Sequence, residues 1–416
     1  MKGNVVTELK PVKFGLVGIG GYGASYVTNI LALEKEGLGT FGAAVVRSRG
    51  KYPEQEKALA ERGVPIVGTM EEMLALGKSQ FDVVAIPTGI EWHRDQVIRA
   101  AEAGFNIICE KPTTATIQDF DAMSAALQRA GTWCQIGFQS QSAPAVRNLK
   151  SEICSGRLGR VKEVIVTCCW MRDNHYYARN SWAGKLTCNG RWVLDGTINN
   201  PQAHYLFNGL YFASNEPGQA ALPKSVRAEL YHAHEIESED TACLEALCQN
   251  GAKVYFYGTV AASANAHSVI EVFGERGRAV WDSTQTLRFY EGERLVSEVP
   301  PPALDGSVEQ WRNVARRYRG EDKELNCPLE MTRAHVLAVN GAFLSSAVTR
   351  QISADGLEIT ELAEPKPHIR TVITGIEKIA ARAAAGRKLY SDLGVPWAAR
   401  TQAVDVSRLT TFDFPR

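Results

Sequence analysis

Residues 12–23 read VKFGLVGIGGYG, an apolar, strand-like run that passes directly into a turn built from glycines. From Gly18 onward the turn has the spacing G-x-G-x-x-G, which permits a tight turn, close approach of the backbone to a pyrophosphate, and packing of the next helix on the strand. The pattern alone is weak, but a strand before it and a helix after it favour a dinucleotide site over a mere tight turn. The predicted cofactor-binding turn comprises Gly18, Ile19, Gly20, Gly21, Tyr22 and Gly23.

The first third of the chain alternates short apolar runs with amphipathic stretches, which is typical of a parallel sheet with crossover helices. The pattern predicts strands at residues 13–17, 42–46, 81–86, 105–109 and 132–136, and helices at 22–36, 55–62, 70–76, 92–103 and 117–129. The fold class is therefore α/β, and residues 1–135 are expected to form an NAD(P)-binding Rossmann domain.

Beyond residue 135, strand-like segments are mostly joined by hairpin-scale turns, which indicates a largely antiparallel sheet. Strands are predicted at 160–171, 225–237, 241–247, 252–260, 268–274, 278–282 and 286–290, and helices at 141–155, 202–212, 307–319, 327–346 and 369–385. Residues 136–416 are expected to form an α+β domain for substrate binding and oligomerisation, with a large, mostly antiparallel open sheet. One sheet face is left free to pair in a homodimer or homotetramer, unless the C-terminal helix packs back over it.

The balance of charges excludes whole classes of partner. The 416 residues carry 46 Lys and Arg against 46 Asp and Glu, so the net charge is zero and does not attract nucleic acid or an anionic membrane. With 45% hydrophobic and 22% charged residues, the sequence is typical of a soluble globular protein, and a small-molecule partner is expected. Residues 1–13 are polar where a signal peptide needs an apolar core, and no later stretch is long enough to span a bilayer, so we expect a cytoplasmic protein.

Metal chemistry is not expected. The nine cysteines include no C-x-x-C pair, and most are expected to be small buried hydrophobic residues. His232 and His234 alternate along one predicted strand, but the pattern supplies no clear cysteine or carboxylate partner for them.

The end of the second predicted strand favours NADP, with NAD as the alternative. NAD-preferring sites usually place Asp or Glu there to hold the ribose hydroxyls, whereas this run ends in Arg47, Ser48 and Arg49. Guanidinium groups match the oxygens of a 2′-phosphate. The competing interpretation is a solvated loop whose arginines contact nothing.

Glu110, Lys111 and Pro112 end a further apolar run downstream of the glycine turn. A lysine fixed at a strand end can handle a hydroxyl proton, because burial disfavours its charged form. Oxidation of a secondary alcohol requires such a group within hydrogen-bond reach. The alternative is a surface lysine in a salt bridge with Glu110.

Four motifs, in this order, resemble those of the Gfo/Idh/MocA family, named for glucose-fructose oxidoreductase and inositol dehydrogenase: Ile86-Pro87-Thr88, Trp92-His93, Glu110-Lys111-Pro112 and Gly156 to Val161. The resemblance spans nearly the whole chain. It implies a Rossmann domain, a second domain whose open sheet serves oligomerisation, and hydride exchange between a nicotinamide and a sugar-like carbinol. It places Lys111 beside the nicotinamide and the substrate hydroxyl, and implies a cis Lys111-Pro112 bond. Further cofactor-site residues follow from the same motifs: Pro87, Thr88, His93, Glu110 and Lys111.

The family's second signature is Asp-x-Gly-x-His at the opening of a helix. Asp195 matches the aspartate, but Asn199 stands in the place of the histidine, and asparagine cannot accept a proton at neutral pH. Asn200 followed by Pro201 predicts an N-cap, which puts His204 in the first helical turn. There the positive helix end keeps a histidine neutral, as a general base requires, although it can also simply pack in a groove. The expected catalytic residues are Lys111, Asp195, His204 and Asn199.

An aromatic and cationic stretch follows the first predicted strand of the second domain. Aromatic faces and fixed donors suit the two kinds of surface of a sugar ring, and the family often draws sugar ligands from this region, although a plain surface loop can have the same composition. The expected substrate contacts are Lys111, Tyr176, Tyr177, Arg179, Trp182, Asn200 and His204.

Three functions are compatible with these patterns. The leading one is an NAD(P)-dependent dehydrogenase acting on a secondary alcohol of a sugar, cyclic polyol or glycoside. The second is redox-neutral glycoside cleavage through a transient keto-sugar, with the cofactor staying bound. The third is a regulatory member of the family that binds a nucleotide without turnover, which Asn199 keeps open.

Overall fold

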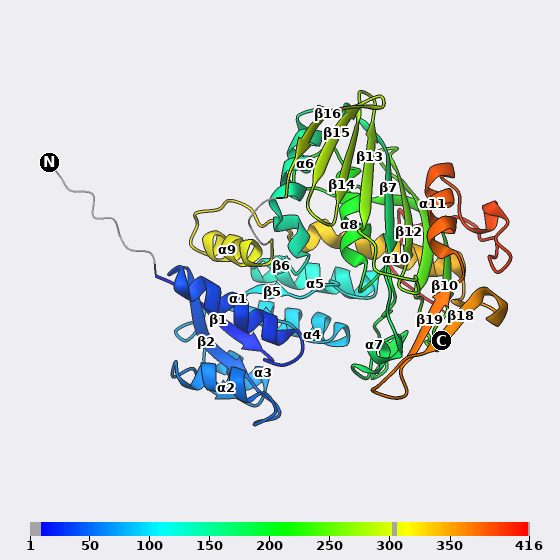
Figure 1. The fold of residues 1–416 in the computed structure, drawn as a ribbon. Helices are drawn as coiled ribbons and strands as arrows, with labels where there is room; N and C mark the ends of the chain where they lie inside the picture. The colour runs from blue at the N-terminus through cyan, green and yellow to red at the C-terminus, as the bar shows by residue number, and fades with distance from the viewer. Residues whose placement is uncertain (1–9, 302–305, 415–416) are drawn as a thin grey trace. The chain divides into compact units, whose positions relative to one another are not determined.

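The computed structural model describes residues 10–301 and 306–414, and the chain divides into two compact units (Figure 1). Unit 1 takes residues 1–113, 122–143 and 304–329, and unit 2 takes residues 114–121, 144–303 and 330–416. The boundary at residue 135 stays a prediction. Residues 1–9, on which the expectation of no signal peptide partly rests, lie outside the described residues. Among the described residues, no helix has both the length and the apolar character needed to cross a membrane.

Unit 1 is built on a six-stranded, all-parallel sheet in the order β3-β2-β1-β4-β5-β6, which confirms the predicted Rossmann architecture. Its strands are β1 (Val12–Val17), β2 (Gly39–Val45), β3 (Ile66–Val67), β4 (Val83–Ile86), β5 (Asn106–Cys109) and β6 (Cys134–Ile136). Every residue of β4 is buried, because helices cover both faces of such a sheet. This double burial is why the strands read as continuous apolar runs.

The crossover helices form within a few residues of their predicted positions. They are α1 (Gly23–Lys35), α2 (Pro53–Ala60), α3 (Met70–Ala75), α4 (Ile90–Glu102) and α5 (Ile117–Ala130), followed by a 3-10 turn at Gln139–Ser142. Local signals set their starts: Pro53 is the first residue of α2, and Thr69 and Glu72 form a capping box at α3.

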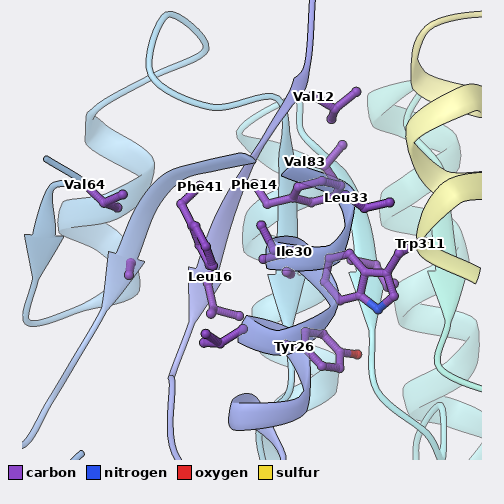
Figure 2. Close-up of a cluster of buried hydrophobic side chains, with 14 of the residues drawn as sticks. Val12, Phe14, Leu16, Tyr26, Ile30, Leu33, Phe41, Val64, Val83 and Trp311 are labelled. Atoms are coloured by element: carbon purple, nitrogen blue, oxygen red, sulfur yellow. The ribbon is translucent and has the colours of Figure 1, made fainter. Parts of the chain in front are cut away.

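Helix α9 (Gly306–Tyr318) belongs to unit 1, although it lies far downstream in the sequence. Its Trp311 is 1% exposed and meets Phe14 of β1 and Tyr26 of α1 edge-on, with ring centroids 5.1 Å and 4.8 Å apart (Figure 2). Arg312 adds two hydrogen bonds to Glu36 at 2.7 Å and 2.9 Å. The indole of Trp311 therefore completes the core on one side of the parallel sheet.

Unit 2 contains a ten-stranded sheet in the order β16-β15-β14-β13-β7-β12-β11-β10-β17, with β20 also paired to β10. Only the β7–β12 and β10–β17 pairs are parallel, which confirms a mostly antiparallel sheet. Its strands are β7 (Val161–Cys169), β10 (Pro223–His232), β11 (Thr241–Cys248), β12 (Lys253–Thr259), β13 (Val269–Gly274), β14 (Arg278–Asp282), β15 (Leu287–Glu291), β16 (Arg294–Val299), β17 (Arg350–Gln351) and β20 (Val404–Asp405).

Helices cover both faces at the middle of this sheet (Figure 1). Gly209 of α8 (Ala203–Phe212) lies directly against Val166, whereas the neighbouring Ile165, on the opposite face, packs in one cluster with α11 (Ile376–Gly386). The C-terminal helix thus packs back over the central strands β7 and β12. The remaining elements are α6 (Pro144–Cys154), α7 (Asn174–Ala178), α10 (Arg333–Ser346), 3-10 turns at Leu329–Thr332, Ala354–Gly356 and Ser391–Leu393, and two hairpins, β8 (Thr187–Cys188) with β9 (Arg191–Trp192) and β18 (Leu357–Glu361) with β19 (Ile369–Ile373).

Three predicted elements were wrong at one end. The helix predicted over 369–385 begins only at Ile376, because its first five residues pair with β18 and Gly375, at φ +69°, separates the two. The strand predicted to residue 237 ends at His232, because the Asp240 carboxylate takes the next two backbone N–H groups. The helix predicted from Cys327 starts at Arg333, since the intervening proline disfavours helical backbone at Cys327.

Replacing Trp311 with alanine is expected to lower the free energy of unfolding by about 3–5 kcal/mol, because it empties a fully buried site between β1 and α1. Urea unfolding followed by circular dichroism measures the change. The matched control is Leu76→Ala, at a 36% exposed position in the same unit, with an expected effect within about 0.5 kcal/mol. Equal effects of the two substitutions would contradict the packing described for α9.

Candidate active site

Two positions of the glycine turn have no room for a side chain. A Cβ at Gly23 would lie 2.5 Å from the Gly18 carbonyl oxygen, and one at Gly20 would lie 1.9 Å from the Tyr52 ring. Gly18 itself has φ +99°, which L-residues rarely adopt. Helix α1 therefore begins directly on the end of β1, as the dinucleotide pattern requires.

Three loops leave the carboxyl edge of the parallel sheet from the strands β1, β4 and β5, which lie side by side in that order. They carry the glycine turn, Pro87-Thr88 and Glu110-Lys111. His93 of α4 joins the last two loops, because one ring nitrogen lies 3.0 Å from the Thr88 carbonyl oxygen and the other 2.9 Å from that of Pro112. Burial, together with the charge of Lys111, lowers the pKa of His93, so its ring is neutral and serves as a support between loops.

Glu110 is 7% exposed and accepts a hydrogen bond of 3.2 Å from the Tyr26 hydroxyl of α1. Burial raises its pKa to about 7, against the opposing effect of the Lys111 charge. Gly137 makes this packing possible, since a Cβ there would lie 2.7 Å from the carboxylate. Lys111 is partly buried, and the Lys111-Pro112 bond is cis, as the resemblance implied.

The predicted phosphate-binding loop follows β2. Arg47, Ser48 and Arg49 are all exposed there. The Arg49 guanidinium donates to the Ile66 carbonyl at 3.2 Å and lies 3.9 Å from the Glu56 carboxylate, so part of its donor capacity is used within the protein. This loop places the arginines at the carboxyl edge of the sheet but does not choose between NADP and NAD.

In unit 2, Asp195 is 3% exposed, and both of its carboxylate oxygens accept hydrogen bonds. Oδ2 accepts from the Gly184 N–H at 2.7 Å and from Arg179 at 3.3 Å, and Oδ1 accepts from the Asn200 amide at 2.5 Å. The structure thus brings together three of the predicted site residues, Arg179, Asp195 and Asn200. Their contacts fix the plane of the carboxylate.

Asn200 is not the helix N-cap that the sequence predicted. Helix α8 begins at Ala203, and its cap residue Gln202 uses its amide to donate to the carbonyls of Cys168 and Thr259, at 3.2 Å and 2.8 Å. Asn200 lies three residues before the first helical residue, and its amide donates to Asp195. His204, half-buried, is consequently the second residue of the helix.

Asn199 is fully buried and donates to the Val193 carbonyl at 3.1 Å. Its amide therefore holds together the turn that carries Asp195. A direct catalytic role for Asn199 stays a prediction.

The aromatic stretch forms the connection around α7. The Arg179 guanidinium carbon lies 3.7 Å from the Tyr176 ring centroid and 5.2 Å from that of Trp182, a cation–π arrangement. Tyr177 packs instead on the ring of His234, with centroids 5.0 Å apart. Tyr176, Arg179 and Trp182 are thus held as one group whose arginine reaches Asp195.

Sequence reasoning missed two buried acids in the turn between β10 and β11. Glu239 lies against Gly196, where a Cβ would come within 1.9 Å of it, and accepts the Ile198 N–H at 3.1 Å. Burial raises its pKa to about 8, and the neighbouring Asp195 charge adds to the rise. Asp240 lies 2.7 Å from the His234 ring nitrogen. The signal was an acidic pair directly before an apolar strand, at a place where a turn is usually solvated.

Comparison with known proteins gives two family matches. Residues 12–138 match the family described as oxidoreductase family, NAD-binding Rossmann fold, and residues 146–280 match the GFO/IDH/MocA C-terminal domain.

Individual relatives match over shorter segments. The chain is 33% identical over 121 residues to 1,5-anhydro-D-fructose reductase of Ensifer adhaerens, covering 29% of this chain and 36% of the relative. It is 37% identical over 79 residues to scyllo-inositol 2-dehydrogenase (NAD(+)) of Bacillus subtilis, covering 19% of this chain and 23% of the relative. The match therefore spans only about a third or less of these two proteins.

Among solved structures, the WlbA dehydrogenase of Bordetella pertussis in complex with NADH and UDP-GlcNAcA has a TM-score of 0.67 at 22% identity. The superposition covers 81% of this chain and 96% of that one. At this identity the likeness establishes the fold.

Glu239→Gln is expected to flatten the dependence of stability on pH. The pKa of Glu239 is about 8 in the folded protein and near 4.5 when unfolded, so between these pH values only the unfolded chain loses the proton. Its contribution to the free energy of unfolding therefore falls by on the order of 5 kcal/mol as pH rises from about 4.5 to 8, and is constant above.

Urea unfolding at pH 5 and pH 8 measures this slope. The variant is expected to lose less stability than the parent over the interval. Glu61→Gln, at an exposed position, is the control and should leave the slope unchanged. An unchanged slope in Glu239→Gln would show that Glu239 titrates normally.

Proposed function

Because the chain belongs to the Gfo/Idh/MocA oxidoreductase family, we propose that it transfers hydride between a nicotinamide cofactor and a secondary alcohol of a sugar, cyclic polyol or glycoside. The observation that carries the proposal is the position of Glu110-Lys111. This loop leaves the same edge of the parallel sheet as the glycine turn, two strands away. In an open α/β sheet, ligands bind at this edge, where the strand order reverses.

The residues present fit a nicotinamide dinucleotide. Gly18 and Gly21 have open space where a Cβ would stand, so a pyrophosphate can approach the backbone N–H groups at the start of α1. The neighbouring loop carries Pro87 and Thr88, and His93 supports it. Such a cofactor supplies the hydride acceptor or donor. We assign NADP as the preferred form, since Arg47 and Ser48 stand where an NAD site usually has an acid.

We propose that Lys111 accepts the proton of the substrate hydroxyl. Removal of hydride from a carbinol carbon requires that its hydroxyl lose a proton at the same time, and an amine within hydrogen-bond reach can take it. The buried Glu110 next to it exchanges its own proton near pH 7, so the local charge around the lysine changes in the working range of pH. Asp195 and His204 are the further catalytic residues of this proposal, and Tyr176, Tyr177, Arg179, Trp182 and Asn200 its substrate contacts.

Assembly through the large sheet is part of the same proposal, as is a cytoplasmic location. Trp281 of β14 points towards Tyr205 of α8, so the alternate residues of β14 point to the other face. There Arg278 pairs with Glu271 at 2.7 Å and Asp282 with Arg288 at 3.0 Å, all of them partly exposed. Beyond the reach of α11, this face offers charged and aromatic groups for pairing in a homodimer or homotetramer.

Lys111→Met is expected to reduce kcat at least about 100-fold while changing the dissociation constant for NADPH far less, because it removes the proton acceptor but leaves the glycine turn intact. Initial rates of nicotinamide reduction across a sugar and polyol panel, with fluorescence titration of NADPH, measure both quantities. Lys78→Met, at an exposed position of the same unit, is the control. Normal turnover in Lys111→Met would refute its role.

His204→Ala separates the two candidate bases. If His204 accepts the proton, its removal also costs about 100-fold or more in kcat. Near-normal turnover would leave the role to Lys111 alone.

In the parent protein, release of an aglycone without net reduction of the cofactor would identify glycoside cleavage. Absence of turnover across the panel would favour the regulatory alternative.

Arg47→Ala is expected to weaken NADP binding by roughly 10-fold and to leave NAD binding nearly unchanged, since only NADP carries the phosphate that the guanidinium contacts. Isothermal titration with each cofactor measures the two affinities. Parent protein that binds NAD at least as tightly as NADP would contradict the assignment.

A further inference from the structure

Two guanidinium groups surround one tyrosine ring in unit 2. The carbon of the Arg179 guanidinium lies 3.7 Å from the Tyr176 ring centroid, and that of Arg172 lies 5.3 Å from the same centroid. Arg172 is also 5.3 Å from the ring centroid of Trp170. We call these residues and Trp182 the cationic–aromatic cluster. Two like charges so close to one ring need anions nearby to compensate them.

The protein compensates only one of the two charges. Arg179 has the Asp195 carboxylate at 3.3 Å. Arg172 donates to the Met171 carbonyl at 2.8 Å and to the side-chain oxygen of Asn265 at 3.3 Å, both neutral acceptors. Within residues 10–301 and 306–414, Arg172 has no carboxylate at ion-pair distance, and the adjacent Asp173 is already paired with His368 at 2.8 Å.

This environment prepares Arg172 for a carboxylate ligand. The guanidinium is partly buried, and a cation withdrawn from water without a counterion is costly. Aromatic rings beside its plane, and an anchor at one terminal nitrogen, restrict its orientation. The remaining N–H groups in the plane match two carboxylate oxygens, which is the bidentate geometry that a lysine cannot offer.

The cluster is also tied to the residues assigned to the reaction. The Trp170 ring that flanks Arg172 packs edge-on against Tyr205 of α8, with centroids 5.5 Å apart, and Tyr205 directly follows His204. On its other side, Arg179 contacts Asp195. An anion held by Arg172 therefore belongs to a molecule that also meets these candidate substrate contacts.

We propose that Arg172 binds the carboxylate of the substrate, so that the substrate is a sugar acid and not a neutral sugar. This inference rests on the proposed function, because it names the class of sugar on which the proposed hydride transfer acts. A phosphate group on the sugar presents related oxygens, but a single guanidinium balances a carboxylate charge for charge, which favours the acid.

Matched substrate pairs test the inference. Turnover of D-glucuronate, D-galacturonate and D-gluconate is compared with that of D-glucose, D-galactose and D-glucitol, with glucose 6-phosphate as the phosphate arm. The acids are expected to exceed their neutral partners in kcat/KM by roughly 10-fold to 100-fold. Arg172→Gln should bring this ratio close to one, and Arg172→Lys should keep part of it, because it retains the charge without the fork.

Arg157→Gln is the matched control, since Arg157 also stacks on a ring, that of Phe289 at 3.8 Å, outside the cluster. It should keep the parent ratio. Isothermal titration of D-glucuronate into parent and Arg172→Gln protein gives a readout that is independent of turnover, and circular dichroism verifies that the variants fold.

The outcomes separate the two proposals. Turnover of neutral sugars at least as fast as of the acids, or a preference for the phosphate, overturns the carboxylate inference and leaves the proposed function standing. Absence of turnover with every sugar and both cofactors counts against the proposed function. In that case, binding of glucuronate that depends on Arg172 still supports the carboxylate site, and equal binding by Arg172→Gln overturns it.

Discussion

The hydrogen bond from the Tyr26 hydroxyl to the buried Glu110 carboxylate, 3.2 Å long, joins the helix that starts at the glycine turn to the loop that carries Lys111. Trp311 packs edge-on against the same tyrosine ring, so α9 is fixed to this point as well. The contact requires α1 to lie close to β1, which only glycine at position 23 allows. The glycine turn and the loop that carries Lys111 thus share one rigid support.

Much of unit 1 could be predicted because its signals are local. The strands are buried on both faces, so they read as apolar runs, and the glycine turn has a fixed spacing.

The elements of either unit that escaped prediction are short or depend on distant partners. Strand β3 has two residues, and the segment Ile369–Ile373 was absorbed into the alanine-rich helix that follows it. Its β-branched residues and Gly375 were the signals for a strand and a break.

The candidate site of unit 2 was predictable in its residue types but not in its contacts. Asp195, Arg179 and Asn200 were all expected in the site, yet nothing in their spacing indicates that the asparagine amide bonds the aspartate instead of capping α8. Glu239 escaped because its burial arises from a separate turn that folds against Gly196. The acidic pair before an apolar strand was visible in the sequence, but its burial depends on tertiary packing, which that local pattern does not encode.

In the proposed reaction, hydrogen passes directly from a sugar carbon to the nicotinamide while Lys111 takes the hydroxyl proton. The most direct measurement uses sugars and sugar acids that carry deuterium at every carbon-bound position, with mass spectrometry of the recovered cofactor. The reduced cofactor is expected to carry one deuterium atom, and Lys111→Met is expected to form this labelled cofactor at least about 100-fold more slowly than the parent protein. Reduced cofactor without deuterium, or converted sugar with no label ever passing through the cofactor, would contradict it.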